Sequence, residues 1–448
     1  MALLLEGAHV VDPQVGLDEV ASVLVRDGRV VEVGARVEKP AKCVVRDLSG
    51  CYLLPGLVDA HVHFRDPGLE YKEDVVSGMR AAARGGFTAV APMANTQPAI
   101  DTGALVAYEL EKCAWEPGRT RLLPVGACTK GLAGERLAEM GDMAKNGAVA
   151  FSDDGRGVQD AGMMRRVMDY AKMLDRPVLS HCQDEGLVAD GVADEGEVST
   201  ALGLAAWPAS GEEVQIARDI ELARLTGCRL HVQHVTTARG VELVARAKAD
   251  GVPVTCEATP HHLFLDSSFI RRQTYDTDLK VNPPLRRAAD ALALQEALLD
   301  GTIDMVSTDH APHAAHEKAL EFNLAPFGTV GLETALATVL TCLVSAPAAS
   351  FEAGEWTGLS KERMGWARLV EVFAAGPRKL LGQPAVRVEP GGVADFTVVD
   401  PDAEWTVDAA GFASKGRNSA FAGKHLRGAV VETYTAGYAT FQDGEVTF

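Results

Sequence analysis

Two different patterns of apolar and polar positions divide the chain. At both ends, short runs alternate apolar and polar residues, as strands with one buried face do. Near the N-terminus, the runs 22–26 and 29–33 are joined by Asp27-Gly28, and Asp443-Gly444 interrupts the last such run. Asp-Gly between alternating runs is a strong signal for a β-hairpin. We therefore predict one small β-sandwich domain, assembled from residues 1–52 and 386–448.

Residues 53–385 have a different rhythm, in which short apolar runs alternate with stretches of helical period. The eight predicted strands cover 57–62, 87–91, 121–126, 148–151, 177–180, 229–233, 252–256 and 303–307. Helices are predicted between most of them, at 73–84, 163–174, 212–226, 240–249 and 290–299. Glycines stand where helix C-caps are expected, before several of these strands. The pattern is typical of an α/β (β/α)8 TIM-like barrel.

Composition restricts the partners and the compartment of such a chain. Its 448 residues carry 43 basic and 62 acidic side chains, a net charge of −19, which argues against a nucleic-acid partner. The apolar run at the start is too short for a signal peptide, and no stretch reaches the length of a membrane span. The eight cysteines are scattered without a C-x-x-C pair, as in a reducing compartment. We expect a cytoplasmic protein with no membrane partner.

Residues of the metal-ligand type stand at the ends of five predicted strands. The first strand ends in His61 and His63, which share one face because side chains on a strand alternate. The other four ends carry Asp154, His181, His234 and Asp309. Chemistry in such barrels gathers at the C-terminal ends of the strands. Four imidazoles and two carboxylates suit zinc or a similar divalent ion, as one site or as two ions sharing a carboxylate.

Neighbouring residues of the same types leave some choices open. Asp153 competes with Asp154, and we favour Asp154 because only one of the two can face the centre of the barrel. His310 follows Asp309 directly and should face away, and His231 stands three residues before His234. We therefore leave His310 and His231 out of the candidate site.

The longer motifs of the chain resemble those of one known family. They are DAHVHFRDPG at 59–68, PMANT at 92–96, SDDG at 152–155, VNPPLR at 281–286, STDHAPH at 307–313 and APFGTVGLE at 325–333. In this order they are similar to class I dihydroorotases of the amidohydrolase superfamily. The resemblance covers the predicted barrel and both flanking β segments. It implies reversible cyclisation of N-carbamoyl-L-aspartate to L-dihydroorotate, with release of water, in de novo pyrimidine (UMP) synthesis.

The resemblance also implies roles for individual residues. The implied ligands of one or two zinc ions are His61, His63, Asp154, His181, His234 and Asp309, with Asp154 bridging if two ions bind. The implied substrate-binding residues are His63, Arg65, Asn95, Asn282, His313, Phe327 and Gly328, the last two through their backbone. Asp309 is also the implied general base. A guanidinium such as Arg65 offers the fork that a substrate carboxylate accepts, although Arg65 could instead pair with Asp66 or Glu70.

Other functions remain to be distinguished. Hydantoinases and class II dihydroorotases bridge two metals with a carboxylated lysine at the end of the fourth strand, but residues 147–155 contain no lysine and Lys145 lies before that strand. This disfavours another cyclic-amide hydrolase, such as a hydantoinase or an allantoinase. A non-catalytic dihydroorotase-like partner subunit of aspartate transcarbamoylase should have lost metal ligands, whereas all six are present. The sequence leaves open whether the chain forms a homodimer or associates with aspartate transcarbamoylase while active.

The segment 312–328, after the last predicted strand, is charged and has no clear period. Long irregular loops at an active face often close over substrate. We therefore expect this segment to be mobile and to become ordered when substrate binds.

Overall fold

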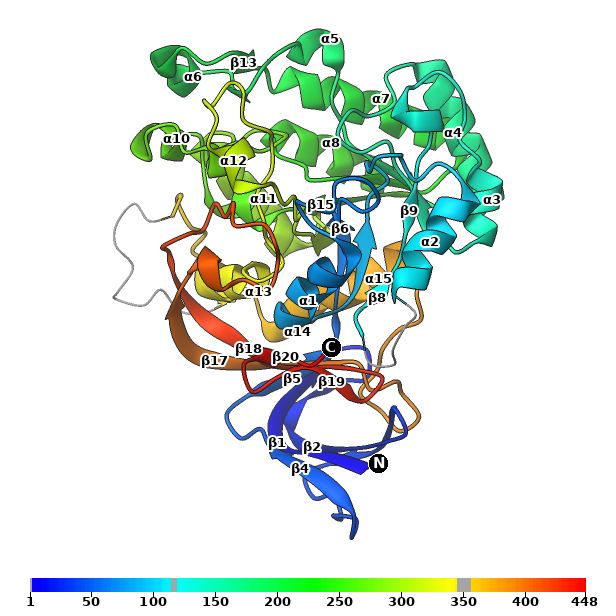
Figure 1. Ribbon diagram of the computed structural model, residues 1–448, viewed down its shortest axis with the longest axis vertical. Helices are drawn as coiled ribbons and strands as arrows, with labels where there is room; N and C mark the ends of the chain where they lie inside the picture. The colour runs from blue at the N-terminus through cyan, green and yellow to red at the C-terminus, as the bar shows by residue number, and fades with distance from the viewer. Residues whose placement is uncertain (1, 114–118, 345–355) are drawn as a thin grey trace.

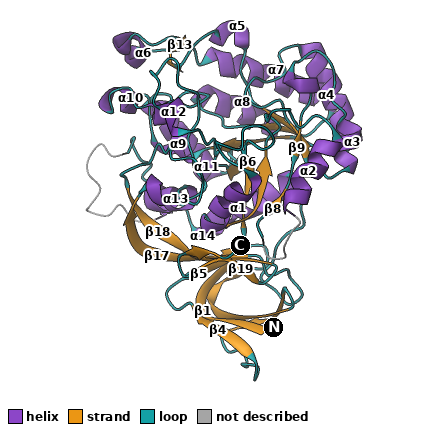
Figure 2. Ribbon diagram, viewed as in Figure 1, coloured by secondary structure: helices purple, strands orange, loops and turns teal. Residues whose placement is uncertain are grey.

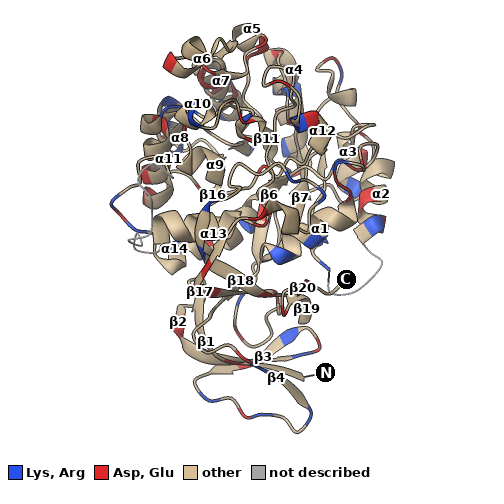
Figure 3. Ribbon diagram, turned by 60° about the vertical axis from the view of Figure 1, so that its left-hand side comes forward, with Lys and Arg blue, Asp and Glu red and all other residues tan. Residues whose placement is uncertain are grey.

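A computed structural model describes residues 2–113, 119–344 and 356–448. Both ends of the chain lie in one mixed β-sheet at the bottom of Figure 1, and most helices and the parallel strands lie above it. Figure 2 shows helices around the short strands of this upper part. Among the described residues, no helix is both long and apolar enough to cross a membrane. Acidic and basic residues are interspersed over the helices and the sheet (Figure 3).

The mixed sheet has nine strands and joins residues from opposite ends of the chain. Its order is β20-β19-β18-β17-β5-β1-β2-β3, with β4 paired to β1. The strands are β1 Ala2–Asp12, β2 Leu17–Arg26, β3 Arg29–Gly34, β4 Cys43–Asp47, β5 Tyr52–Pro55, β17 Phe396–Thr406, β18 His425–Thr435, β19 Tyr438–Gln442 and β20 Glu445–Val446. The predicted hairpins are confirmed, because β2 pairs with β3 and β19 pairs with β20, both antiparallel. Leu5, Val10, Leu53, Phe396 and Tyr434 form part of a buried cluster on this sheet.

The parallel strands form a three-stranded sheet, β6-β7-β8, and a six-stranded sheet, β16-β15-β14-β11-β10-β9. They are β6 Leu57–Val62, β7 Phe87–Pro92, β8 Arg121–Leu122, β9 Val125–Gly126, β10 Ala150–Phe151, β11 Val178–Ser180, β14 Leu230–Val232, β15 Val254–Ala258 and β16 Met305–Val306. All eight predicted strands are present in this set. The third predicted strand, 121–126, is divided at Pro124, which has no N–H to donate. Its first part, β8, pairs with β7, and its second part, β9, pairs with β10.

The helices follow the predicted alternation with strands. They are α1 Val75–Arg84, α2 Gly103–Cys113, α3 Met140–Lys145, α4 Ala161–Met173, α5 Glu185–Val188, α6 Glu197–Leu202, α7 Ser210–Thr226, α8 Ala238–Ala249, α9 Pro260–Phe264, α10 Ser268–Arg272, α11 Ala288–Asp300, α12 Ala315–Lys318, α13 Ala335–Val339, α14 Trp366–Val370 and α15 Gly376–Leu380. Asp74 caps α1 by accepting a hydrogen bond from the Ser77 amide. Gly227 ends α7 in the left-handed conformation.

Some elements differ from the prediction. The short strands β12 Ala193–Asp194 and β13 Ala206–Trp207 pair with each other between β11 and β14, and no strand was predicted there. Short helical turns, η1 Lys130–Leu132, η2 Thr277–Leu279, η3 Leu340–Val344, η4 Glu371–Ala375 and η5 Ala409–Gly411, complete the described structure. The largest buried cluster contains residues of both the parallel strands and the helices around them. The strand ends that carry polar residues are therefore anchored in the core.

Candidate functional site

The strand β6 places the first two histidines. All six of its residues are buried, as expected for a parallel strand that is covered on both faces. His61 lies on the strand and His63 follows directly after it, and their ring centroids are 5.3 Å apart. The His63 amide donates to the His310 carbonyl oxygen (2.8 Å), next to Asp309. The predicted convergence of the two imidazoles is therefore present.

The remaining strand ends bring their polar side chains to the same place. Asp154 Oδ1 lies 3.4 Å from both His61 Nε2 and His181 Nδ1, and 3.8 Å from His234 Nε2. Asp154 Oδ2 lies 3.4 Å from His63 Nε2, which is 2.9 Å from Asp309 Oδ1. Six side chains from five strand ends thus form one buried cluster, although the sequence separates its first and last members by more than half of the chain.

Hydrogen bonds on the outer side of the cluster orient three of its imidazoles. Carboxylate and amide oxygens can only accept, so each ring nitrogen that faces one carries the proton. His61 Nδ1 lies 2.7 Å from Glu257 Oε1, and His63 Nδ1 lies 2.8 Å from the amide oxygen of Asn95. His181 Nε2 lies 2.9 Å from the amide oxygen of Gln183. The second nitrogen of each ring faces the cluster, which is the arrangement that a bound cation would require of its imidazole ligands.

The charges in the cluster depend strongly on one another. Burial lowers the pKa of His61, but the carboxylates of Asp154, Asp309 and Glu257 outweigh it and raise that pKa well above its usual value. Burial raises the pKa values of Asp154 and Asp309, but the neighbouring histidines, His61 first, lower both well below the usual range. Both aspartates are therefore ionised at neutral pH.

Three residues at the site have backbone angles that side chains rarely adopt. The φ angles are +60° at Arg65, +31° at His234 and +47° at Asp309. Each follows a strand of the parallel sheets by a few residues. Positive φ at residues other than glycine is strained and is concentrated at functional sites. The strained residues here lie just after the strand ends, where the side chains meet.

The donor set fits a divalent cation. Two overlapping groups, His61 with His63 and Asp309, and His61 with Asp154 and His234, each have ligand atoms within 4.8 Å of one another. Asp154 Oδ1 and His234 Nδ1 are buried without a hydrogen-bond partner. Buried polar atoms usually have partners, and imidazole with carboxylate is a common ligand set for zinc.

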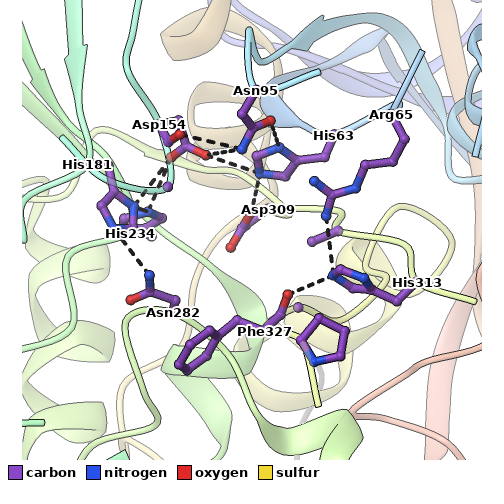
Figure 4. A pocket seen from close by; sticks show the side chains of 14 residues that line it. His63, Arg65, Asn95, Asp154, His181, His234, Asn282, Asp309, His313 and Phe327 are labelled. Carbon is purple, nitrogen blue, oxygen red and sulfur yellow. Dashed lines mark hydrogen bonds and ion pairs between the residues drawn. The ribbon is translucent and has the colours of Figure 1, made fainter. Parts of the chain in front are cut away.

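A cavity of about 310 Å³ opens on the cluster (Figure 4). Every residue of the predicted site except His61 lines it: His63, Arg65, Asn95, Asp154, His181, His234, Asn282, Asp309, His313, Phe327 and Gly328. His61 is fully buried and does not line the cavity. Gly155, Ala311 and Pro326 also line the cavity and were not predicted.

Arg65 points across the cavity toward His313 (Figure 4), and its Nη2 lies 3.4 Å from His313 Nε2. The alternative ion pairs of Arg65 do not form, since Asp66 contacts Lys112 Nζ (2.6 Å) and Glu70 accepts from the Gly68 amide (2.9 Å). Burial, together with the charge of Arg65, lowers the pKa of His313 to about 2. The His313 ring is therefore neutral.

Comparisons with known proteins show the family to which the chain belongs. Residues 50–240 match the family model described as Dihydro-orotase-like. The chain is 49% identical to a dihydroorotase of Pelotomaculum thermopropionicum, over 99% of both chains. It is 46% identical to a dihydroorotase of Geobacter metallireducens, over 99% of this chain and 100% of the other. The chain belongs to the dihydroorotase family.

Solved structures place this family member among the cyclic amidohydrolases. An L-hydantoinase from Arthrobacter aurescens superimposes with a TM-score of 0.85 at 26% identity, covering 100% of this chain and 97% of the other. A D-hydantoinase superimposes with a TM-score of 0.80 at 22% identity, a likeness that concerns the fold alone.

The dihydroorotase-family motifs did not reveal two residues that orient the site. Glu257, on β15, contacts both His61 (2.7 Å) and His231 (3.1 Å) and is fully buried. Gln183, just after β11, contacts His181 and accepts from Asn282 Nδ2 (2.9 Å). A charged residue inside an apolar strand was the available signal for Glu257.

The residues that were set aside have other partners in this dihydroorotase-family chain. Asp153 accepts from the amides of Cys128 (2.8 Å) and Thr129 (3.0 Å), so it faces away from the cluster. His310 contacts Glu73 Oε2 (3.3 Å). His231 Nε2 contacts Glu257 (3.1 Å) and Nδ1 contacts Thr255 (2.8 Å).

Proposed function

We propose that this protein is a dihydroorotase, which reversibly cyclises N-carbamoyl-L-aspartate to L-dihydroorotate and water in pyrimidine biosynthesis. One observation carries the proposal: the cation-binding cluster and the implied substrate-binding residues line a single cavity. Identity of 49% over the full chain to a dihydroorotase supports it independently.

The proposed ligands of a divalent cation, which we take to be zinc, are His61, His63, Asp154, His181, His234 and Asp309. When bound, such a cation polarises the amide carbonyl and lowers the pKa of water. The chain contributes preorganisation, because Glu257, Asn95 and Gln183 already orient three imidazoles so that one nitrogen of each ring faces the cluster. Asp154 lies nearly equidistant from the histidines and is the proposed bridge if two ions bind.

The far side of the cavity is suited to an anionic ring. Arg65 carries a positive charge there without an acidic partner among the residues described, and we assign it to the substrate carboxylate. Asn95 and Asn282 offer amide groups to the cavity. His313, which is neutral, also lines the cavity, and its Nδ1 has no hydrogen-bond partner in the described part of the chain. The backbone of Phe327 and Gly328 completes this wall.

Asp309 is the proposed general base. It is ionised and lies 2.9 Å from His63 Nε2, at the junction between the cluster and the cavity. In the hydrolytic direction, Asp309 takes a proton from the attacking water and gives it to the ring nitrogen as the amide bond breaks. In the direction of cyclisation, it takes the proton from the ureido nitrogen and returns it to the departing water.

Two alternatives are less well supported. Hydantoinases share the fold, as the structural neighbours illustrate, but the substrates of hydantoinases and allantoinases lack the carboxylate that Arg65 is placed to bind. A non-catalytic partner of aspartate transcarbamoylase would not need a complete set of ligands, and this chain has one.

We further propose that the parallel sheets close into the expected (β/α)8 barrel over residues 53–385, with residues 1–52 and 386–448 as a separate β domain. Two features support closure: β8 and β9 continue one run of chain, and a parallel bridge joins Val62 to His310. We also propose a cytoplasmic location, supported by the scatter of the eight cysteines along the sequence without a C-x-x-C pair.

The proposal is tested by comparing substrates with the purified protein. Hydrolysis of L-dihydroorotate and cyclisation of N-carbamoyl-L-aspartate should both proceed, with kcat/KM for dihydroorotate far above that for hydantoin or allantoin. Faster turnover of hydantoin would favour the hydantoinase alternative, and turnover of none of these compounds would favour a non-catalytic subunit.

A further inference from the structure

Two buried lysines lie behind the wall of the cavity that carries Phe327. Lys280 is 2% exposed and Lys318 is 8% exposed. Lysine is almost never buried to this degree unless it is paired with an acid. Among the described residues, however, neither ammonium group forms an ion pair with a carboxylate, and each donates to backbone carbonyls instead.

The carbonyls that they bind belong to one stretch of chain. Lys280 Nζ donates to the carbonyl oxygens of Asn323 (3.0 Å) and Ala325 (2.7 Å). Lys318 Nζ donates to those of Pro326 (3.0 Å) and Gly328 (2.9 Å). We call residues 323–328 the wall segment. Four of its six carbonyls are thus bound by two side chains, both of which precede the segment in the sequence.

Further contacts fix the wall segment to the same lysine. The Gly328 amide donates to the Lys280 carbonyl oxygen (2.8 Å), and Lys280 Nζ lies 4.6 Å from the centre of the Phe327 ring, as in a cation–π contact. Gly328 has φ of +137°, and a Cβ there would come within 2.8 Å of Ala311. The backbone is therefore tightly constrained where it meets the cavity.

Burying two ammonium groups without a carboxylate partner lowers the stability of the folded protein. Burial lowers the pKa of each lysine to about 8, and the charged groups that act on Lys318 are Asp276 and Asp278 near η2 together with Lys280. Lys318 in turn acts on His313, on the cavity side. Groups whose pKa values are shifted by burial cluster at functional sites, and these two lie directly behind the cavity wall.

We propose that Lys280 and Lys318 are positioning residues that hold the wall segment in the conformation that receives substrate. They act through Phe327 and Gly328, which line the cavity, and do not line it themselves. The lysines therefore determine substrate affinity rather than the rate of the chemical step. Only the identity of the substrate rests on the proposed function.

The prediction that residues 312–328 are mobile without substrate remains untested, and the contacts of these lysines favour the opposite. They predict a wall segment that is already ordered in the free protein. Leu320, just before the wall segment, is 48% exposed, and Leu324, within it, is 68% exposed. Chymotrypsin could therefore cleave after these residues if the segment were released.

The test compares Lys280→Met and Lys318→Met with a control, Lys72→Met. Lys72 contacts the same region through Glu317 (2.8 Å) and binds none of the wall carbonyls. Loss of two hydrogen bonds from a charged donor should raise KM for L-dihydroorotate at least about tenfold, with kcat changed less than about threefold. In ligand-free protein, chymotrypsin should cut after Leu320, Phe322 or Leu324 at least about ten times faster, whereas Lys72→Met should behave like the wild type.

Equal cleavage and equal KM in all three variants would overturn the proposal. If the variants do not fold, hydrogen exchange in the wild type decides, because the Gly328 amide should be protected without ligand. Exchange at the rate of an unstructured peptide would refute an ordered wall. Cleavage and exchange need no turnover, so a wild-type protein without dihydroorotase activity would disprove the proposed function and leave this test intact.

Discussion

Replacing Glu257 with glutamine tests how the buried layer beneath the cavity prepares the site. Glu257 accepts hydrogen bonds from His61 Nδ1 (2.7 Å) and His231 Nε2 (3.1 Å), and Ser307 Oγ also donates to it. Glutamine keeps the shape but has one oxygen in place of two. If its NH₂ group faces His61, Nδ1 must accept a hydrogen bond, and Nε2, the nitrogen that would bind the cation, must then carry the proton of the neutral ring.

The size of the effect follows from the bond that is lost. A hydrogen bond to a charged group contributes about 1.5–3 kcal/mol, which corresponds to roughly 10- to 150-fold in affinity. Loss of an outer partner of a metal-binding histidine typically weakens metal binding by about 10- to 100-fold. The two estimates overlap, so we expect Glu257→Gln to bind zinc about 10- to 100-fold more weakly than the wild type.

The assay is competition for zinc with a chromophoric chelator at fixed pH, which requires no substrate. Glu109→Gln is a matched control, because Glu109 is also a buried glutamate (1% exposed) but lies on α2, outside the cluster. Its zinc affinity should equal that of the wild type. Unchanged affinity in a folded Glu257→Gln protein would show that Glu257 does not orient His61 for the metal.

Two further substitutions test the roles assigned within the cavity. Arg65→Met removes the charge placed for the substrate carboxylate and should raise KM about 10- to 100-fold, as expected for lost charge-assisted hydrogen bonds; an unchanged KM in steady-state kinetics would remove Arg65 from that role. Asp309→Asn should lower kcat by about 10²- to 10⁴-fold in both directions, the usual contribution of a general base. Circular dichroism should show an intact fold, and near-normal turnover would assign the proton transfers to another group.

The sequence was sufficient for features that depend on local pattern. Alternation on one strand placed His61 and His63 together, and the apolar run that ends in them is the strand β6 with the predicted bounds. The strand ends then identified His181 and His234, because parallel strands of this fold present their C-terminal ends on one side. None of these steps required knowledge of contacts between distant residues.

Features that depend on packing between elements could not be predicted in this way. Glu257 acquires its role because β15 lies beside β14 and its side chain reaches His61 on β6. The sequence favoured Asp154 over Asp153, but the contacts that hold Asp153 away, with the amides of Cys128 and Thr129, could not be predicted. The division of the third strand at Pro124 and the short strands β12 and β13 are likewise set by their neighbours.

The most direct test of the central claim is metal analysis combined with removal and return of the metal. If the six side chains from five strand ends bind a catalytic cation, the purified protein should contain one or two equivalents of a divalent metal. Chelation should abolish dihydroorotate turnover, and added zinc should restore it. Full turnover in a sample verified to be free of metal would contradict the account.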